Sequence, residues 1–297
     1  MNLYKTDTED SEKVTVIIPV CNREDWIGDS ISSVLNQTRP PEEVIIVDDG
    51  STDNSAGVIK SFGDRVTYIY QNNQGVSAAR NTGIKSANFP WLAFLDSDDQ
   101  WHPEKLASQL QFLSENPSCR VIHTDEIWIR HGRRVNPRKV HQKHGGMIYD
   151  KCLPRCVISP SSVMIHHTIF EDYGLFDETL PACEDYDMWL RICRSEPVGY
   201  VDQPLITKFG GHQDQLSRSV EALDRFRVRI LLDQLENYPL NQTQICQLLN
   251  VMIKKADILA SGSRKRENFA AMRWYRGVKD RAASLQKWFC VPGCNSV

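Results

Sequence analysis

The chain has 297 residues and a formal net charge of −3, with 35 Lys and Arg against 38 Asp and Glu. This balance excludes the broad basic field of a nucleic-acid-binding protein, and no apolar run approaches the ~20 residues that cross a bilayer. Residues 1–13 lack the apolar middle of a signal peptide, so we expect a cytoplasmic chain whose nine cysteines are reduced thiols.

Short apolar runs alternate with helical patterns through the first third of the chain. Strands are predicted at 14–20, 44–47, 66–70 and 91–95. Helices are predicted at 25–35, 56–62, 75–87 and 103–113. This alternation predicts a parallel sheet with right-handed crossovers, in which ligands bind beyond the carboxyl ends of the strands.

Polar clusters fall at those carboxyl ends, at residues 21–23, 48–51 and 96–99. The last cluster places three carboxylates within four positions, and because like charges repel, a divalent cation is their natural neutraliser. Asp96 and Asp98 are the pair expected on that ion. An Asp-rich turn that caps the next helix is the alternative. The Asp48 and Asp49 pair similarly suits either a ribose or base contact or an Asx turn.

The phosphate-binding patterns GxxxxGK[ST] and GxGxxG do not occur in the sequence. Their absence argues against a P-loop ATPase and against a dinucleotide-dependent dehydrogenase. If a nucleotide binds, a metal ion held by carboxylates must therefore bind its phosphates and neutralise their charge.

The second half of the chain departs from regular alternation. Strands are predicted at 119–129, 198–201 and 205–209. A packed helix is predicted after Cys183, which places Glu184 and Asp185 in its first turn. Carboxylates there suit the helix dipole, and this is the structural alternative to a chemical role.

Four ordered motifs resemble the signature of family 2 glycosyltransferases, and the resemblance extends from residue 14 to about residue 219. The motifs are Val16–Arg23, Val47–Asp53, Asn73–Gly83 and Leu95–Asp99. The resemblance implies the GT-A fold, an α/β fold with a mostly parallel sheet, a nucleotide-binding half and an acceptor half. It also implies a nucleotide-sugar donor, usually a uridine diphosphate sugar, with Mn²⁺ or Mg²⁺ between protein and diphosphate.

The same resemblance assigns roles on the donor side. Pro19 and Cys21 would line the base pocket, and Asp49 would hold the uracil end. Arg80 would reach the nucleotide, Asp96 would touch ribose or metal-bound water, and Asp98 would ligate the ion. The family commonly has an aromatic residue where this chain has Cys21, so stacking on the base is weaker here or is supplied elsewhere.

Roles on the acceptor side follow from the mechanism and from the family pattern. Inversion at an anomeric carbon needs a base opposite the leaving group, and one carboxylate suffices. The family places this base in a Glu-Asp pair that matches Asp185, with Glu184 binding the acceptor. His212 occupies the place of a family histidine that completes the metal shell or touches the diphosphate. An ordinary surface histidine is the alternative.

From residue 220 onward the pattern is helical, with helices predicted at 220–235, 244–259 and 264–289. The last is a basic amphipathic helix bearing Trp274 and Trp288, which suits peripheral contact with an anionic membrane. Packing on the catalytic domain or on a second subunit is the commoner use. The predicted organisation is a poorly ordered segment 1–13, a GT-A domain 14–219 and a helical extension 220–297.

The functional expectation is a metal-dependent inverting glycosyltransferase that uses a nucleotide-diphosphate sugar, most often a UDP-sugar. The acceptor would be a hydroxyl of a glycan or of a lipid-linked glycan in cell-surface polysaccharide or lipopolysaccharide biosynthesis. The expected location is cytoplasmic, including a peripheral position at the inner face of the cell membrane, with no nucleic-acid partner. A noncatalytic nucleotide-sugar-binding scaffold of the same fold is the alternative.

Overall fold

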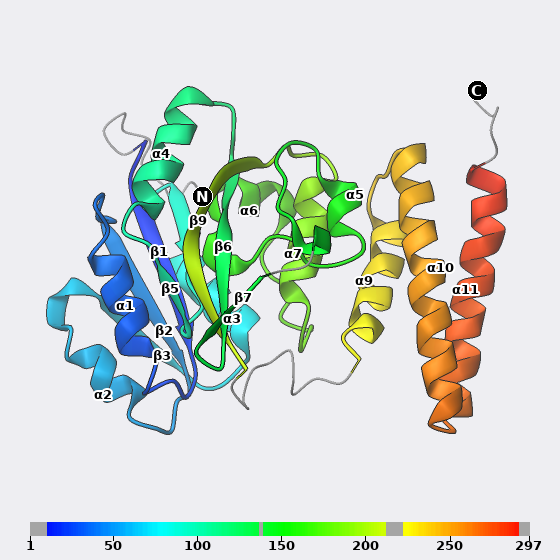
Figure 1. Cartoon of the computed structure of the whole chain (residues 1–297), viewed down its shortest axis with the longest axis horizontal. Helices are drawn as coiled ribbons and strands as arrows, with labels where there is room; N and C mark the ends of the chain where they lie inside the picture. Colours follow the sequence, from blue (N-terminus) through cyan, green and yellow to red (C-terminus); the bar gives the residue numbers. More distant parts are fainter. Residues whose placement is uncertain (1–10, 137–138, 212–221, 291–297) are drawn as a thin grey trace.

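The computed structural model describes residues 11–136, 139–211 and 222–290. These residues form one sheet flanked by helices, followed by three long helices (Figure 1). Along the sheet the strand order is β3-β2-β1-β4-β8-β6-β9-β5, with β7 paired to β6. The predicted α/β fold with a helical C-terminal region is confirmed. Most of the segment 1–13 lies outside the described residues.

Parallel strands form the N-terminal half of the sheet, as predicted. They are β1 (Val14–Val20), β2 (Glu43–Asp49), β3 (Thr67–Gln71) and β4 (Trp91–Phe94). β1 pairs with both β2 and β4, and β2 pairs with β3, all in parallel. The helices that follow these strands are α1 (Ile27–Leu35), α2 (Ser55–Lys60), α3 (Val76–Ser86) and α4 (Lys105–Glu115). Each element lies within a few residues of its predicted span.

The other half of the sheet mixes strand directions. β6 (Val121–Arg130) pairs in parallel with β9 (Gly199–Gly210), and β8 (Met164–His166) lies antiparallel between β4 and β6. β5 (Asp99–Trp101) and β7 (Arg133–Val135) are antiparallel to β9 and β6, respectively. The strands predicted at 198–201 and 205–209 are parts of β9. Its register against β6 shifts at Asp125, opposite Pro204, which has no N–H to donate.

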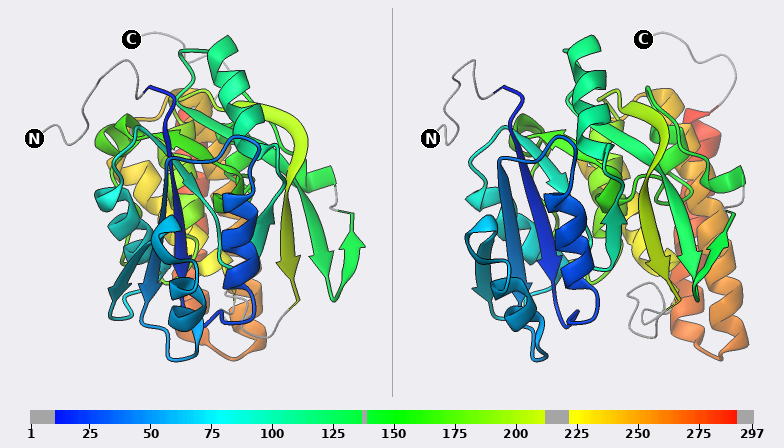
Figure 2. Two further views of the ribbon diagram at one scale, coloured as in Figure 1. Left: turned by 90° about the vertical axis from the view of Figure 1, so that its left-hand side faces the viewer. Right: turned by 60° about the vertical axis from the view of Figure 1, so that its left-hand side comes forward.

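Helices cover both faces of the sheet (Figure 2), and strand side chains alternate between two main apolar cores, one on each face. Val16 and Ile18 of β1 pack with α1, α2 and α4. Ile17 packs instead with α3 and with α5 (Tyr149–Cys152), α6 (Thr168–Tyr173) and α7 (Glu184–Cys193). Every residue of β1 and β4 is buried, because both faces are covered, and this explains their continuous apolar sequences.

The C-terminal helices α9 (Asp224–Asn237), α10 (Gln242–Lys265) and α11 (Phe269–Phe289) stack outward from α7 in that order (Figure 1). Leu231 of α9 and Met252 of α10 belong to the same apolar core as Trp189 of α7. α11 packs on α10 and buries Val278 and Ala282. Within the described ranges, no helix combines the length and apolar character needed to cross a membrane.

A disulfide joins α10 to the end of α11. The two helices are antiparallel, so Cys246, near the start of α10, lies beside Cys290, with a Cα–Cα distance of 5.8 Å. The expectation that all cysteines are reduced is therefore wrong for this pair. Its two members are 44 residues apart, and only the helical hairpin brings them together. The other cysteines in the described part of the chain are free thiols.

Candidate active site

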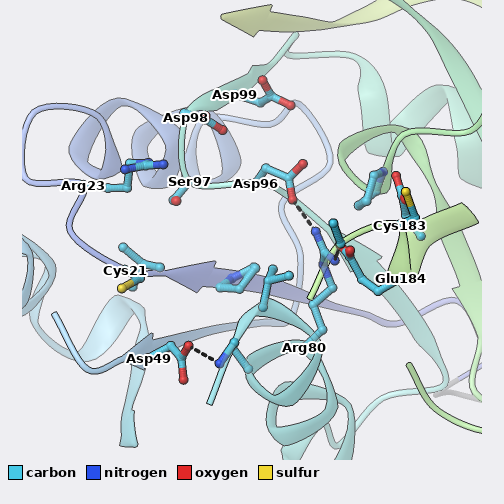
Figure 3. A pocket seen from close by; sticks show the side chains of 18 of the residues that line it. Cys21, Arg23, Asp49, Arg80, Asp96, Ser97, Asp98, Asp99, Cys183 and Glu184 are labelled. Atoms are coloured by element: carbon cyan, nitrogen blue, oxygen red, sulfur yellow. Dashed lines mark hydrogen bonds and ion pairs between the residues drawn. The ribbon is translucent and has the colours of Figure 1, made fainter. Parts of the chain in front are cut away.

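A cavity of about 550 Å³ lies beyond the carboxyl ends of β1, β2 and β4, between the sheet, α7 and the start of α9. Eight residues predicted for the site line it, many of them visible in Figure 3: Pro19, Cys21, Asp49, Arg80, Asp96, Asp98, Glu184 and Asp185. His212, predicted for the metal shell, lies outside the described residues. Side chains from five separate motifs therefore border one common space.

Asp49, at the end of β2, fixes the loop that leads into α3. Its Oδ1 accepts hydrogen bonds from Gln71 Nε2 at 2.7 Å and from the Gln74 amide at 2.9 Å. Its Oδ2 accepts from the amide of Gly75 at 2.8 Å, and Gly75 has a φ of 93°, which favours glycine. Burial and the Asp49 carboxylate raise the pKa of the nearby Cys21 thiol. Cys21 therefore presents a neutral thiol to this wall of the cavity at pH 7.

Arg80 of α3 braces two acidic motifs against each other. Its guanidinium donates from Nη2 to Asp96 Oδ1 and from Nη1 to Glu184 Oε1, both at 2.8 Å (Figure 3). Burial would raise the pKa of Asp96, but Arg80 holds it below its ordinary value. Burial and the neighbouring Asp185 raise the pKa of Glu184, against the opposing effect of Arg80. Arg80 and Glu184, predicted to contact nucleotide and acceptor, thus also bind each other.

Asp98 and Asp99 have different surroundings, although they are adjacent in the sequence. Asp99 is buried and accepts hydrogen bonds from Ser161 Oγ at 2.6 Å and from the Phe209 amide at 3.3 Å. Burial raises the pKa of Asp99 well above its ordinary value, although Lys208 Nζ lies 3.8 Å from Oδ2. Asp99 therefore connects the start of β5 to Ser161 and to Phe209 of β9. Asp98, in contrast, is partly exposed on the cavity wall.

These acidic residues fit a metal ion whose coordination shell is completed by substrate. In the described ranges, no three His, Cys, Asp or Glu side chains are grouped to hold a metal by themselves. Mg²⁺ sites commonly use one or two carboxylates, with substrate phosphates and water as the other ligands. Arg80 donates to Asp96 and Ser161 donates to the buried Asp99, whereas Asp98 is partly exposed on the cavity wall, where it could contribute one carboxylate to such an ion.

Asp185 lies in the first turn of α7, beside the cavity. Cys183, which precedes the helix, has a left-handed φ of 67° and turns the chain into it. Asp185 Oδ2 accepts a hydrogen bond from Cys156 Sγ at 3.1 Å, and burial and Asp185 raise the pKa of that thiol well above its ordinary value. The thiol is therefore a protonated donor. Asp185 Oδ1 also accepts a hydrogen bond from the Tyr186 amide at 2.7 Å, so the carboxylate is oriented by one thiol and one backbone donor.

Sequence reasoning missed three polar residues that line the cavity: Cys156, Lys208 and Arg227. Lys208 falls inside the β9 pattern and Arg227 inside the α9 pattern, and neither belongs to a polar cluster at a strand end. No signal in the sequence distinguishes them from surface cations, because their position depends on how distant elements pack.

Comparison with known proteins identifies the family. The family model described as glycosyl transferase family 2 matches residues 15–174, more than half of the chain, and the chain belongs to this family. An uncharacterized glycosyltransferase of Rickettsia conorii is 35% identical over 199 residues, which are 65% of this chain but only 32% of that relative. The chain thus spans about a third of the length of this relative.

Two further similarities extend over most of the chain. The UDP-Glc:alpha-D-GlcNAc-diphosphoundecaprenol beta-1,3-glucosyltransferase WfgD of Escherichia coli is 30% identical over 253 residues, covering 82% of this chain and 94% of WfgD. The crystal structure of S. aureus TarS 1-349 in complex with UDP-GlcNAc aligns with a TM-score of 0.64 over 92% of both chains. The TarS sequence is 18% identical, so that similarity shows the fold alone.

Proposed function

We propose that this chain is an inverting glycosyltransferase that moves a sugar from a UDP-sugar to a hydroxyl of a glycan or lipid-linked glycan. The observation that carries this proposal is that Asp49, Asp98 and Asp185, from three separate motifs, border one cavity. The printed name of WfgD gives UDP-Glc as donor and a diphosphoundecaprenol-linked sugar as acceptor, and its alignment over nearly its whole length supports the proposal. The assembly of a cell-surface polysaccharide is the setting that fits these substrates.

On the donor side, Asp49 and Cys21 border the proposed uracil pocket. A carboxylate offers about four lone-pair sites. Asp49 uses three of them on protein donors, which leaves capacity for one base N–H. Arg80 acts by holding Asp96 toward the ribose, because its guanidinium is committed to that carboxylate and to Glu184.

On the reacting side, Asp98 would hold Mn²⁺ or Mg²⁺, which when bound offsets negative charge on the departing UDP. Asp185 takes the proton of the acceptor hydroxyl while that oxygen attacks the anomeric carbon and the bond to UDP breaks. The configuration inverts, and no covalent enzyme intermediate forms. The Cys156 thiol orients the Asp185 carboxylate, and Glu184, fixed by Arg80, faces the acceptor from the same helix.

A thermal-shift panel of UDP-sugars with and without Mn²⁺ tests the donor site. We expect the melting temperature to rise only when both are present, because Asp98 alone is a weak metal site that the diphosphate completes. Asp98→Ala should abolish this rise. Asp64→Ala, an exposed position in η2 (Gly63–Arg65) away from the cavity, is the control that should keep it. Stabilisation that is equal with and without metal would refute the role of Asp98.

We also propose that α11 holds the protein peripherally at the inner face of the cell membrane. Large apolar side chains remain exposed on this helix, with Phe269 at 52%, Trp274 at 49% and Trp288 at 76% exposure. Basic side chains exposed on α11 and at the C-terminal end of α10 are Arg264, Lys265, Arg266, Arg273, Arg276, Arg281 and Lys287. Exposed tryptophans among cations suit an anionic lipid surface, where the rings enter the headgroup region.

Cosedimentation with lipid vesicles tests this attachment. We expect the protein to bind vesicles that contain phosphatidylglycerol, and to bind pure phosphatidylcholine vesicles much less, because the basic side chains contribute electrostatically. The double substitution Trp274→Ala with Trp288→Ala should reduce binding to the anionic vesicles. Tyr70→Ala removes an equally exposed aromatic side chain from β3 and should have no effect. Equal binding by the double variant would exclude α11 as the anchor.

A further inference from the structure

Arg227 of α9 brings a cation into the cavity from outside the segment that matches the family. Its guanidinium lies beside the helix that carries Asp185, with its carbon 5.7 Å from the centre of the Tyr186 ring. Leu223, one turn earlier on the chain, and Cys183, at the start of α7, line the same wall. The Arg227 side chain is 20% exposed, so it is held in the wall and still reaches the cavity.

The hydrogen-bonding capacity of Arg227 is only partly used. Nη1 donates to Asp224 Oδ1 at 3.0 Å. Nε is buried and has no hydrogen-bond partner within the described part of the chain. An arginine in a cavity wall normally has most of its five N–H groups bonded, because a buried donor without a partner is costly. The unpartnered Nε shows that the described residues do not use the full donor capacity of this guanidinium, which borders the cavity where a ligand oxygen could bind.

The local charge balance around Arg227 is also incomplete. Asp224 pairs with Lys255 Nζ at 2.7 Å as well as with Arg227, so one carboxylate serves two cations. The Lys255 side chain is only 10% exposed, so water screens this cluster poorly. Glu184 and Asp185 supply carboxylates to the lining of the cavity from α7, and the cluster of Asp224, Arg227 and Lys255 by itself carries a formal charge of +1. An anion at Arg227 would neutralise it.

We propose that Arg227 binds an anionic group of the acceptor, a phosphate or a carboxylate, next to the hydroxyl that Asp185 deprotonates. This inference rests on the proposed function and adds a substrate class to it: the acceptor is negatively charged close to its reacting end. The donor motifs lie at the ends of β1, β2 and β4. Arg227 approaches from α9 beside α7, on the side of the cavity where Asp185, the proposed general base, lies. A guanidinium fork matches the oxygens of phosphate and carboxylate, and its charge-assisted hydrogen bonds are strong.

The experiment is calorimetric titration of the full chain in two steps. The first step adds UDP with Mg²⁺ and reports on the donor site. The second adds inorganic phosphate, and in a parallel arm sodium glucuronate, to protein that is saturated with UDP and Mg²⁺. We expect one of the two anions to bind the wild-type chain and to bind Arg227→Gln on the order of 10- to 100-fold more weakly. The arm that responds identifies phosphate or carboxylate as the group.

Variants separate recognition from folding. Arg227→Lys keeps the charge next to Asp224 and should bind the anion with intermediate affinity. Arg229→Gln makes the same charge change at an exposed position of α9 and should bind like the wild type. If neither anion binds the wild-type chain, or if Arg227→Gln binds it equally, the inference is wrong. If UDP does not bind in the first step, the proposed function is wrong. Titrating the same two anions into protein without UDP then still tests whether Arg227 binds an anion.

Discussion

Replacing Asp185 with Asn is expected to lower kcat for sugar transfer by about 10²- to 10⁴-fold, the usual contribution of a general base. The amide cannot take the proton of the attacking hydroxyl, but it keeps the size of the carboxylate and can still accept the hydrogen bond from Cys156. Affinity for UDP should stay the same, because the donor motifs lie on other elements. Release of UDP from a UDP-sugar with a mixed glycan acceptor pool measures transfer, and calorimetry measures UDP affinity.

The outcome also separates catalysis from the scaffold alternative. Asp64→Asn, which makes the same change of charge at an exposed position, should transfer at the wild-type rate. A noncatalytic nucleotide-sugar-binding protein would show no transfer in the wild type and no effect of Asp185→Asn on any cellular function. If wild-type transfer is measurable and Asp185→Asn retains it within tenfold, Asp185 is not the base, and Glu184 becomes the carboxylate to test.

Replacing Arg80 with Met is expected to lower the free energy of unfolding by about 3–5 kcal/mol, the usual cost of removing one partner of a buried ion pair. The Arg80 and Glu184 side chains are 3% and 7% exposed, so Glu184 would keep a buried charge without a partner. Asp96 would lose the same partner at 26% exposure. Urea unfolding followed by circular dichroism measures the change.

Two comparisons make this stability prediction specific. Arg39→Met removes an exposed ion pair with Glu42 and should cost roughly 0–1 kcal/mol. Adding Glu184→Gln to Arg80→Met should restore part of the lost stability, because it removes the carboxylate that Arg80 neutralised. A loss no larger than that of Arg39→Met would show that Arg80 does not brace the site.

The sequence did not distinguish the different surroundings of Asp96, Asp98 and Asp99, the acidic residues predicted near the metal ion. The sequence places three carboxylates within four positions, and Asp96 and Asp98 were the pair predicted to bind the ion. In the folded chain Asp96 binds Arg80 and Asp99 is buried against Ser161, whereas Asp98 is a partly exposed residue of the cavity wall. Arg80 and Ser161 come from α3 and from the segment before β8. Their contacts with the acidic loop depend on packing that no local pattern encodes.

The sequence by itself determined the parallel half of the sheet, the family and eight residues of the cavity. These properties depend on short-range patterns: continuous β-branched strands, alternating helices, and polar clusters that must meet at one sheet edge because parallel strands end there. Only the tertiary structure decided that Arg80 joins Asp96 to Glu184, that Cys156 donates to Asp185, that Cys246 meets Cys290, and that Arg227 reaches the cavity. Each of these contacts joins side chains from separate elements. Whether such side chains meet is set by how helices and strands pack, which sequence spacing alone does not specify.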